Sequence, residues 1–340
     1  MLDELIVPQK LNKGDTIALI SISGGRAGDE DMLPRYEEGK HRLADVFGLN
    51  VIETPNALKG SDFLYEHPEL RAEDLMWALK NPDVKGIICN MGGDDSYRVL
   101  PYIDTQVIHD NPKVFIGYSD IATWMAVFAH ASVRAYYGPN LLTPIAQPIG
   151  LDKYTEDAMK RVLFTSEIIG EIKPCAEFTS IEWKSIFDPG EIQWTPNNGY
   201  HILQGKGKHY GRIFGGTAGP FRQIMGTKYY PSPEFFEGAF VLLETGLLYD
   251  SGLAFLHELR AFAASGMFDK AEGIITKSLN YEERDILLKV INQEVRRDDI
   301  VILENVDFVH RTPMTVIPMG AQCEIDCDNA RFSILESGVC

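Results

Sequence analysis

One serine stands where a reactive nucleophile would be placed. In KVFIGYSDIATW, residues 113–124, an apolar run ends at Gly117 and Ser119 follows two positions later. The apolar spacing then becomes helical, which predicts a strand, a sharp turn and a helix. A serine on such a turn projects beyond the carboxyl end of a strand, where open parallel sheets bind their ligands. Serine is also a preferred helix N-cap, and the local pattern alone favours capping over a nucleophile.

A serine nucleophile needs a base that takes its proton and a third group that orients that base. His310 follows the apolar segment IVILENV and lies in the proline-containing loop VHRTPMTVIPMG, which would hold an imidazole in place. Many loop histidines are structural, so this position alone does not decide its role. Glu244 directly follows the apolar residues AFVLL, where a carboxylate is costly without a partner. His310 and Glu244 are therefore the candidate base and acid.

A glycine pair could supply the remaining element of such a site. Gly92 and Gly93 end a predicted buried strand and could bring backbone N–H groups close to a ligand, or they could simply form a strand-to-helix turn. Asp94 and Asp95 follow. These two carboxylates could contact a cationic group of a substrate, but the spacing favours a cap of the helix expected from Ser96.

Composition excludes several classes of protein. The 340 residues are 45% hydrophobic and 24% charged, which allows a large core and predicts two domains. The formal net charge of −17 disfavours binding to nucleic acids and to anionic membrane surfaces. The five cysteines are scattered, as in proteins of reducing compartments, and no secretory signal or membrane-span pattern is evident. We expect a cytoplasmic protein whose partner is a small molecule.

The elements that must position these residues alternate between strands and helices. Strands are predicted at residues 15–23, 49–55, 84–93, 113–119 and 133–140, with helices at 30–48, 68–83 and 121–131 between them. Such alternation predicts a parallel sheet with helices on both faces. A first α/β domain is expected over residues 1–165 and a linker with a long loop over 166–206.

The remaining residues, 207–340, predict a mixed α/β domain. Strands are expected at residues 208–216, 237–246, 271–278 and 299–306, helices at 253–266 and 283–295, and a closing hairpin at 323–335 that turns at Asp328 and Asn329. Glu324, Asp326 and Asp328 alternate along this hairpin, which indicates a solvated face rather than a metal site. Gly24, Gly25 and Gly28 lack the spacing of a dinucleotide-binding loop. Neither a metal nor another cofactor is expected.

Five segments together resemble one family. GGDDSYRVLPYID, NPKVFIGYSDIATW, GRIFGGTAGPFRQIMGTKYYP, FVLLETG and VHRTPMTVIPMG match, in order and spacing, the serine peptidases that include LD-carboxypeptidases and microcin C immunity proteins. The resemblance implies that Ser119 is the nucleophile, that Glu244 orients His310, and that the N–H groups of Gly93 and Asp120 form the oxyanion hole. It also implies a homodimer.

The resemblance further implies a fold. It predicts an N-terminal parallel-sheet α/β domain like that of flavodoxin or glutamine amidotransferases, and a C-terminal mixed α/β domain with a swivelling barrel-like sheet. Two positions depart from the family pattern: Thr217 replaces a frequent Asn and Val309 a frequent Gly. Neither departure removes a reacting group, but both leave substrate preference open. Ile121 in place of a second glycine argues against an α/β-hydrolase esterase.

The segment FTSIEWKSIFDPGEIQWTPNNGYHILQGKGKHYG discriminates between the branches of this family. It is long and aromatic and resembles the immunity-type loop, in which an aromatic side chain stacks on a nucleobase. Phe178, Trp183 and Trp194 are the candidates, although each could instead pack the loop onto the second domain. We expect hydrolysis of the bond between an aminoacyl group and a nucleotide. Removal of a terminal D-alanine from cell-wall tetrapeptides and a non-catalytic binding protein on the same fold are the alternatives.

Overall fold

The computed structural model describes residues 2–179, 192–245 and 252–340. A six-stranded sheet in the order β14-β5-β4-β3-β1-β2 forms the centre of the first half. Its strands are β1 (Thr16–Ile20), β2 (Asn50–Glu53), β3 (Val84–Cys89), β4 (Val114–Gly117), β5 (Tyr136–Tyr137) and β14 (Ile317–Pro318). The first five run parallel, whereas β14 pairs antiparallel with β5. The predicted parallel sheet is confirmed.

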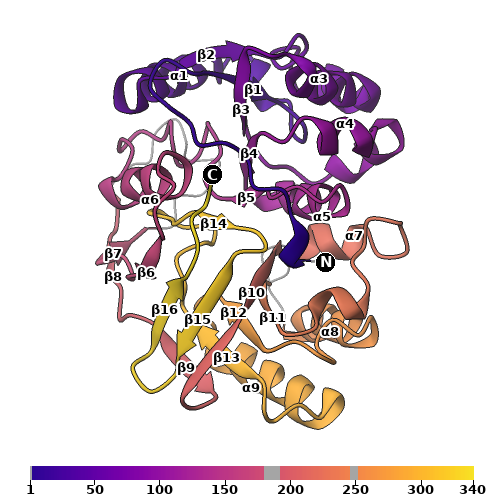
Figure 1. The fold of residues 1–340 in the computed structure, drawn as a ribbon, viewed down its shortest axis with the longest axis vertical. Helices are drawn as coiled ribbons and strands as arrows, with labels where there is room; N and C mark the ends of the chain where they lie inside the picture. The colour runs from indigo at the N-terminus through magenta and orange to yellow at the C-terminus, as the bar shows by residue number, and fades with distance from the viewer. Residues whose placement is uncertain (1, 180–191, 246–251) are drawn as a thin grey trace.

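Helices cover both faces of this sheet. Those of the first half are α1 (Leu33–Phe47), α2 (Ser61–Glu66), α3 (Pro68–Lys80), α4 (Thr105–Asp110), α5 (Ala122–His130) and α6 (Lys153–Leu163), with 3₁₀ turns η1 (Leu2–Glu4), η2 (Arg26–Gly28), η3 (Ser96–Tyr102) and η4 (Ser119–Ile121). Figure 1 shows α1 and α6 on one side of the sheet and α3, α4 and α5 on the other. Parallel strands covered on both faces are uniformly apolar, as the fully buried β4 is.

The second half contains an eight-stranded mixed sheet in the order β6-β16-β15-β10-β11-β12-β13-β9. Its strands are β6 (Gly170–Ile172), β9 (His201–Gln204), β10 (Lys208–Thr217), β11 (Ala239–Glu244), β12 (Gly273–Thr276), β13 (Val301–Glu304), β15 (Gln322–Asp326) and β16 (Arg331–Ile334). The helices are α7 (Ala218–Gln223), α8 (Gly252–Ala264), α9 (Tyr281–Lys289), the 3₁₀ turn η6 (Pro233–Phe236) and the π-helical η7 (Val290–Val295). This mixed α/β half confirms the predicted fold class.

The expected linker, residues 166–206, supplies the two edge strands of the second sheet, β6 and β9. β6 pairs with β16, and β9 pairs with β13. Between them, the short β7 (Glu177–Phe178) and β8 (Thr195–Pro196) form a two-stranded sheet of their own. Conversely, β14 returns from the second half to the first sheet (Figure 1). The two halves are therefore joined by strand pairing as well as by chain connections.

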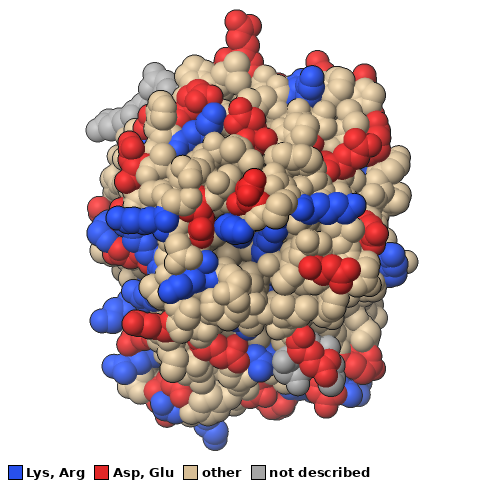
Figure 2. All heavy atoms as spheres, turned by 45° about the horizontal axis from the view of Figure 1, so that its top comes forward, with Lys and Arg blue, Asp and Glu red and all other residues tan. Residues whose placement is uncertain are grey.

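Acidic and basic side chains are mixed on one face of the molecule. The face in Figure 2 carries acidic and basic side chains in close alternation, with a loose row of basic side chains across its middle. No helix within the described residues has the length and apolar character that a membrane crossing requires.

Candidate active site

The turn that carries Ser119 has an unusual backbone. β4 ends at Gly117, and Ser119 adopts a positive φ of 68°, a left-handed conformation that is rare for residues other than glycine. The N-cap positions of η4 and α5 are Tyr118 and Ile121, and neither helix start has a side-chain cap. The capping interpretation of Ser119 is therefore wrong. A strained backbone at an isolated serine is instead typical of a functional turn.

The glycine pair after β3 lies against this turn. A Cβ on Gly92 would come within 2.7 Å of Ser119 Cβ and 2.9 Å of its Oγ, and one on Gly93 within 2.5 Å of Ser23 Oγ. Only glycine fits at either position. Within the described residues, the N–H groups of Gly93 and Asp120 donate no turn or loop hydrogen bond. The Gly92–Gly93 turn and the Ser119–Asp120 turn are in direct contact.

The Asp120 carboxylate links its own turn, after β4, to the turns after β1 and β3 by hydrogen bonds. The sequence did not indicate this role. Its Oδ2 accepts hydrogen bonds from Ser23 Oγ at 2.5 Å and from the Ser96 N–H at 2.8 Å. The second bond caps η3 from outside that segment. Burial raises the pKa of Asp120, partly offset by these hydrogen bonds. The ends of β1, β3 and β4 are therefore fixed relative to one another at the carboxyl edge of the sheet.

The two aspartates after the glycine pair differ from expectation. Asp95 makes no cap hydrogen bond; its carboxylate instead binds the buried guanidinium of Arg71 through two contacts of 2.9 and 3.1 Å, and that of Arg98 at 2.9 Å. The predicted cap is wrong for Asp95 because two arginines compete for its oxygens. Asp94 is exposed, and its carbonyl accepts a hydrogen bond from Gln223.

Glu244 and His310 are brought together from the ends of β11 and β13. Nδ1 of His310 lies 2.9 Å from both carboxylate oxygens of Glu244, and the backbone N–H of His310 donates to Oε1 at 2.7 Å. Glu244 is 1% exposed. Burial alone would raise its pKa, but the electrostatic interaction with His310 and hydrogen bonds from His310 and Thr217 outweigh burial and lower it. Glu244 thus fixes the orientation of the imidazole.

The imidazole also lies beside Tyr118, the residue before Ser119. The His310 and Tyr118 rings lie 4.9 Å apart between centroids, and the His310 side chain is 30% exposed. In the part of the chain that the structure describes, Ser119 Oγ and His310 are not hydrogen-bonded to each other. Bonds between nucleophile and base often tighten only when substrate is present.

The base of the aromatic segment is anchored to the His310 loop. Thr179 and Thr312 exchange backbone hydrogen bonds, both 2.8 Å long. The Phe178 ring lies 4.2 Å from the guanidinium of Arg311, so one of its faces is already covered. Trp194 is 37% exposed, and Trp183 lies outside the described residues.

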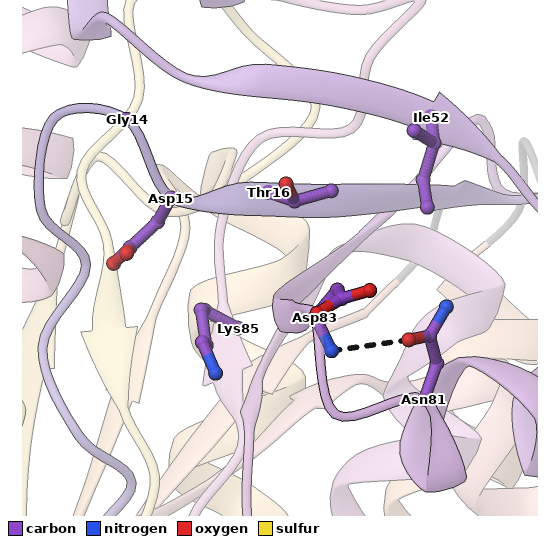
Figure 3. A pocket seen from close by; sticks show the side chains of 7 residues that line it. All are labelled: Gly14, Asp15, Thr16, Ile52, Asn81, Asp83 and Lys85. Atoms are coloured by element: carbon purple, nitrogen blue, oxygen red, sulfur yellow. Dashed lines mark hydrogen bonds between the residues drawn. The ribbon is translucent and has the colours of Figure 1, made fainter.

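Two further polar features include none of the residues above. A pocket of about 390 Å³ lies where β1 and β3 begin, at the opposite edge of the sheet from Ser119. Figure 3 shows the side chains that line it. It is lined by Gly14, Asp15, Thr16, Ile52, Asn81, Asp83 and Lys85. On the closing hairpin, Glu324 pairs with Lys208 and Asp326 binds Asn329. Asp328 is exposed and Glu324 half-buried, but Asp326 is buried, so the predicted solvated face is wrong for Asp326. No group of potential metal ligands occurs among the described residues.

The lowered pKa of Glu244 predicts a pH dependence of stability. A carboxyl whose pKa in the folded state lies below its ordinary value of 4.5 stabilises the fold above that value, and the contribution is lost as pH falls through the folded pKa. Urea titrations should therefore show that Glu244→Gln is less stable than wild type at about pH 7 and that the gap narrows towards about pH 3. A difference in stability that widens as the pH falls would contradict the lowered pKa of Glu244 and its pairing with His310.

Comparison with known proteins identifies the family. The LD-carboxypeptidase N-terminal domain matches residues 17–138 and the LD-carboxypeptidase C-terminal domain matches residues 210–325. The chain is 28% identical to "Putative carboxypeptidase YocD" of Bacillus subtilis, over 93% of this chain and 95% of the relative. It is also 28% identical to the "Microcin C7 self-immunity protein MccF" of Escherichia coli, over 78% of each.

A solved structure agrees in fold along nearly the whole chain. The MccF-like protein of Streptococcus pneumoniae, crystallised in complex with AMP, superposes with a TM-score of 0.84 at 27% identity, covering 94% of this chain and 98% of that one. The chain belongs to the LD-carboxypeptidase family, which confirms the resemblance read from its motifs. It is a serine carboxypeptidase-like hydrolase.

Proposed function

We propose that Ser119, His310 and Glu244 form a catalytic triad that hydrolyses the bond between an aminoacyl group and a nucleotide. The observation that carries the triad is the pairing of His310 Nδ1 with both oxygens of Glu244 at 2.9 Å, beside a serine held in a left-handed turn. This pairing leaves Nε2 of the imidazole as the nitrogen that can take the proton of a nucleophile.

The mechanism follows from these positions. Ser119 Oγ attacks the acyl carbonyl while His310 Nε2 takes its proton, and the buried Glu244 stabilises the resulting imidazolium. The Gly93 and Asp120 N–H groups stabilise the negative charge that develops on the carbonyl oxygen. His310 then protonates the leaving group, and a water molecule, activated by the same imidazole, hydrolyses the acyl-enzyme.

The nucleotide branch is supported by relatives and by the aromatic segment. One relative confers immunity to microcin C7, and a related structure contains AMP. The 37% exposed indole of Trp194 lies in the segment that joins the His310 loop through Thr179 and Thr312. Stacking of a base on an aromatic ring contributes about 1–3 kcal/mol, which is enough to select substrates that carry a nucleobase.

Cleavage of cell-wall peptides is the second candidate. The family descriptions and the Bacillus subtilis relative both name carboxypeptidases. The same triad would then release a terminal D-alanine from an L,D-tetrapeptide. A homodimer, a cytoplasmic location and a contact of Asp94 with substrate stay predictions.

A side-by-side assay separates the two substrates. Purified protein is incubated with an aminoacyl sulfamoyl adenylate, intact microcin C and an L,D-tetrapeptide, and the products are identified by mass. We expect cleavage of the nucleotide-bearing compounds. Trp194→Ala should weaken adenylate binding by about 1–3 kcal/mol and leave tetrapeptide cleavage nearly unchanged.

The matched control is Trp77→Ala. Trp77 is also 37% exposed but lies near the end of α3, at the edge of the sheet opposite to Ser119. Trp77→Ala should change the cleavage of neither substrate. Cleavage of the tetrapeptide alone would favour a cell-wall carboxypeptidase. Equal losses of activity in Trp194→Ala on both substrates would show that this part of the segment is structural. Trp183→Ala and Phe178→Ala complete the series, and adenylate cleavage untouched by all three would refute stacking.

A further inference from the structure

Tyr137 lies at the junction between the two parts of the proposed triad. Its strand β5 stands between β4 and β14 in the first sheet. Tyr137 is in register with Gly117, two residues before Ser119, and with Ile317, seven residues after His310. One residue is thus paired through its backbone with the segment of the nucleophile and with the segment that follows the base.

The side chain of Tyr137 extends the same connection. Its hydroxyl accepts a hydrogen bond from the Ser119 N–H at 3.3 Å and lies 2.6 Å from the Thr217 hydroxyl. Thr217 Oγ1 in turn lies 3.1 Å from Glu244 Oε2, closer than the 3.4 Å between that oxygen and the Tyr137 hydroxyl. Ser119, Tyr137, Thr217 and Glu244 therefore form one continuous chain of hydrogen bonds.

The protons in this chain are ordered in one direction. The Ser119 N–H can only donate, and the Glu244 carboxylate can only accept. A hydroxyl group has one proton, so either Tyr137 donates to Thr217 and Thr217 to Glu244, or Thr217 donates to Tyr137 and Tyr137 to Glu244. The shorter contact of Thr217 with Glu244, 3.1 Å against 3.4 Å, favours the first order. Burial and the charge of Glu244 raise the pKa of Tyr137 well above its ordinary value, so it stays a neutral donor.

The backbone next to Thr217 is shaped for this contact. Gly216 has φ 148°, and a Cβ there would lie 2.8 Å from the Tyr137 ring and 3.0 Å from Ala122 Cβ. The end of β10 can pass this close to the first half only because residue 216 has no side chain. The close approach brings the Thr217 hydroxyl between Tyr137 and Glu244.

We propose that Tyr137 and Thr217 are positioning residues that hold the nucleophile turn and the His310–Glu244 pair in register across the two halves of the chain. This role rests on the proposed triad, because it has a catalytic effect only if Ser119 and His310 react together. The Tyr137 hydroxyl holds the N–H of the strained serine, and the Thr217 hydroxyl holds Oε2 of the acid that orients the base. Fixed groups need not reorganise during the reaction.

The test compares Tyr137→Phe with Tyr136→Phe. Both tyrosines are in β5 and fully buried, and each variant loses one hydroxyl; that of Tyr136 donates to the Gly338 carbonyl at 2.8 Å, away from the triad. Tyr137→Phe should lower kcat about tenfold with little change in KM and slow labelling by a fluorophosphonate by a similar factor. Tyr136→Phe should lower only the thermal stability.

Variants of Thr217 test the positioning role independently if Tyr137→Phe folds poorly. Thr217→Val removes the hydroxyl at nearly constant volume and should also reduce kcat, whereas Thr217→Ser keeps the hydroxyl and should restore most of it. The double variant Tyr137→Phe/Thr217→Val should lose little more than the worse single variant, because both changes interrupt one chain.

The outcomes separate this inference from the proposed function. Equal kcat values for Tyr137→Phe and Tyr136→Phe, with wild-type protein still labelled at Ser119, would overturn the positioning role and leave the triad intact. Full activity of Thr217→Val would do the same. Wild-type protein that is not labelled at Ser119 would overturn the triad and the positioning chain together.

Discussion

Ser119→Ala and His310→Ala are each expected to abolish hydrolysis while leaving the fold intact. Ser119 supplies the attacking oxygen and His310 the base, so either change disables the same catalytic unit. Steady-state kinetics on the best substrate of the side-by-side assay should show losses on the order of 10³-fold or more in kcat. Residual activity above about a tenth of wild type in either variant would refute the triad.

Two other residues provide matched controls for these substitutions. Ser132, with φ 58°, is a second serine in the left-handed region, and it follows α5 rather than β4. His209 also pairs with a glutamate, because its Nδ1 lies 2.6 Å from Glu272. Ser132→Ala and His209→Ala should keep wild-type activity. A comparable loss in these controls would mean that the assay reports general destabilisation.

Glu244→Gln should lower kcat by on the order of 10²-fold or more with little change in KM. The amide preserves the shape of the side chain but removes the charge that stabilises the imidazolium, and it can present a donor where His310 Nδ1 needs an acceptor. The same kinetic assay measures the effect. Glu272→Gln, which alters the half-buried pair with His209, is the control and should leave kcat unchanged.

A different result for Glu244→Gln would be informative. If KM rose while kcat stayed at the wild-type value, Glu244 would contribute to substrate binding rather than to the transition state. That outcome would contradict the role given to the His310–Glu244 pair.

The core of the fold could be predicted because its strands are apolar runs that end in turn residues. β4 and β11 are buried along their whole length, and both stood out as apolar segments directly before Ser119 and Glu244. The two-residue β5 lies within the strand predicted over residues 133–140. β14 could not be predicted in this way, because it also has two residues and depends on a pairing with a strand some 180 positions earlier in the chain.

The supporting residues of the site were missed for a related reason. Tyr137 looked like an ordinary strand residue, and Thr217 was noted only as a departure from a family pattern. Their hydroxyls meet because β10 of the second half passes against β5 of the first, a contact that no local pattern encodes. The sequence signal that could have indicated it is the paired glycines Gly215 and Gly216 directly before Thr217, which permit a close approach.

The wrong prediction for Asp95 shows that ion pairs between distant segments can outweigh the local preference of an aspartate for capping a helix. Asp95 precedes η3 and has a residue type that caps helices well, yet two arginines bind its carboxylate, one of them from α3. The Ser96 N–H instead donates to the Asp120 carboxylate, a contact that no local sequence pattern indicates. Ion pairs between distant segments decided which aspartate caps the turn.

The most direct test of the central claim is covalent labelling of Ser119. Wild-type protein is treated with a serine-directed fluorophosphonate, digested, and the modified peptide identified by mass spectrometry. We predict a single adduct on Ser119, absent from Ser119→Ala and formed far more slowly in His310→Ala. No adduct in active protein, or an adduct on another residue, would show that Ser119 is not the nucleophile.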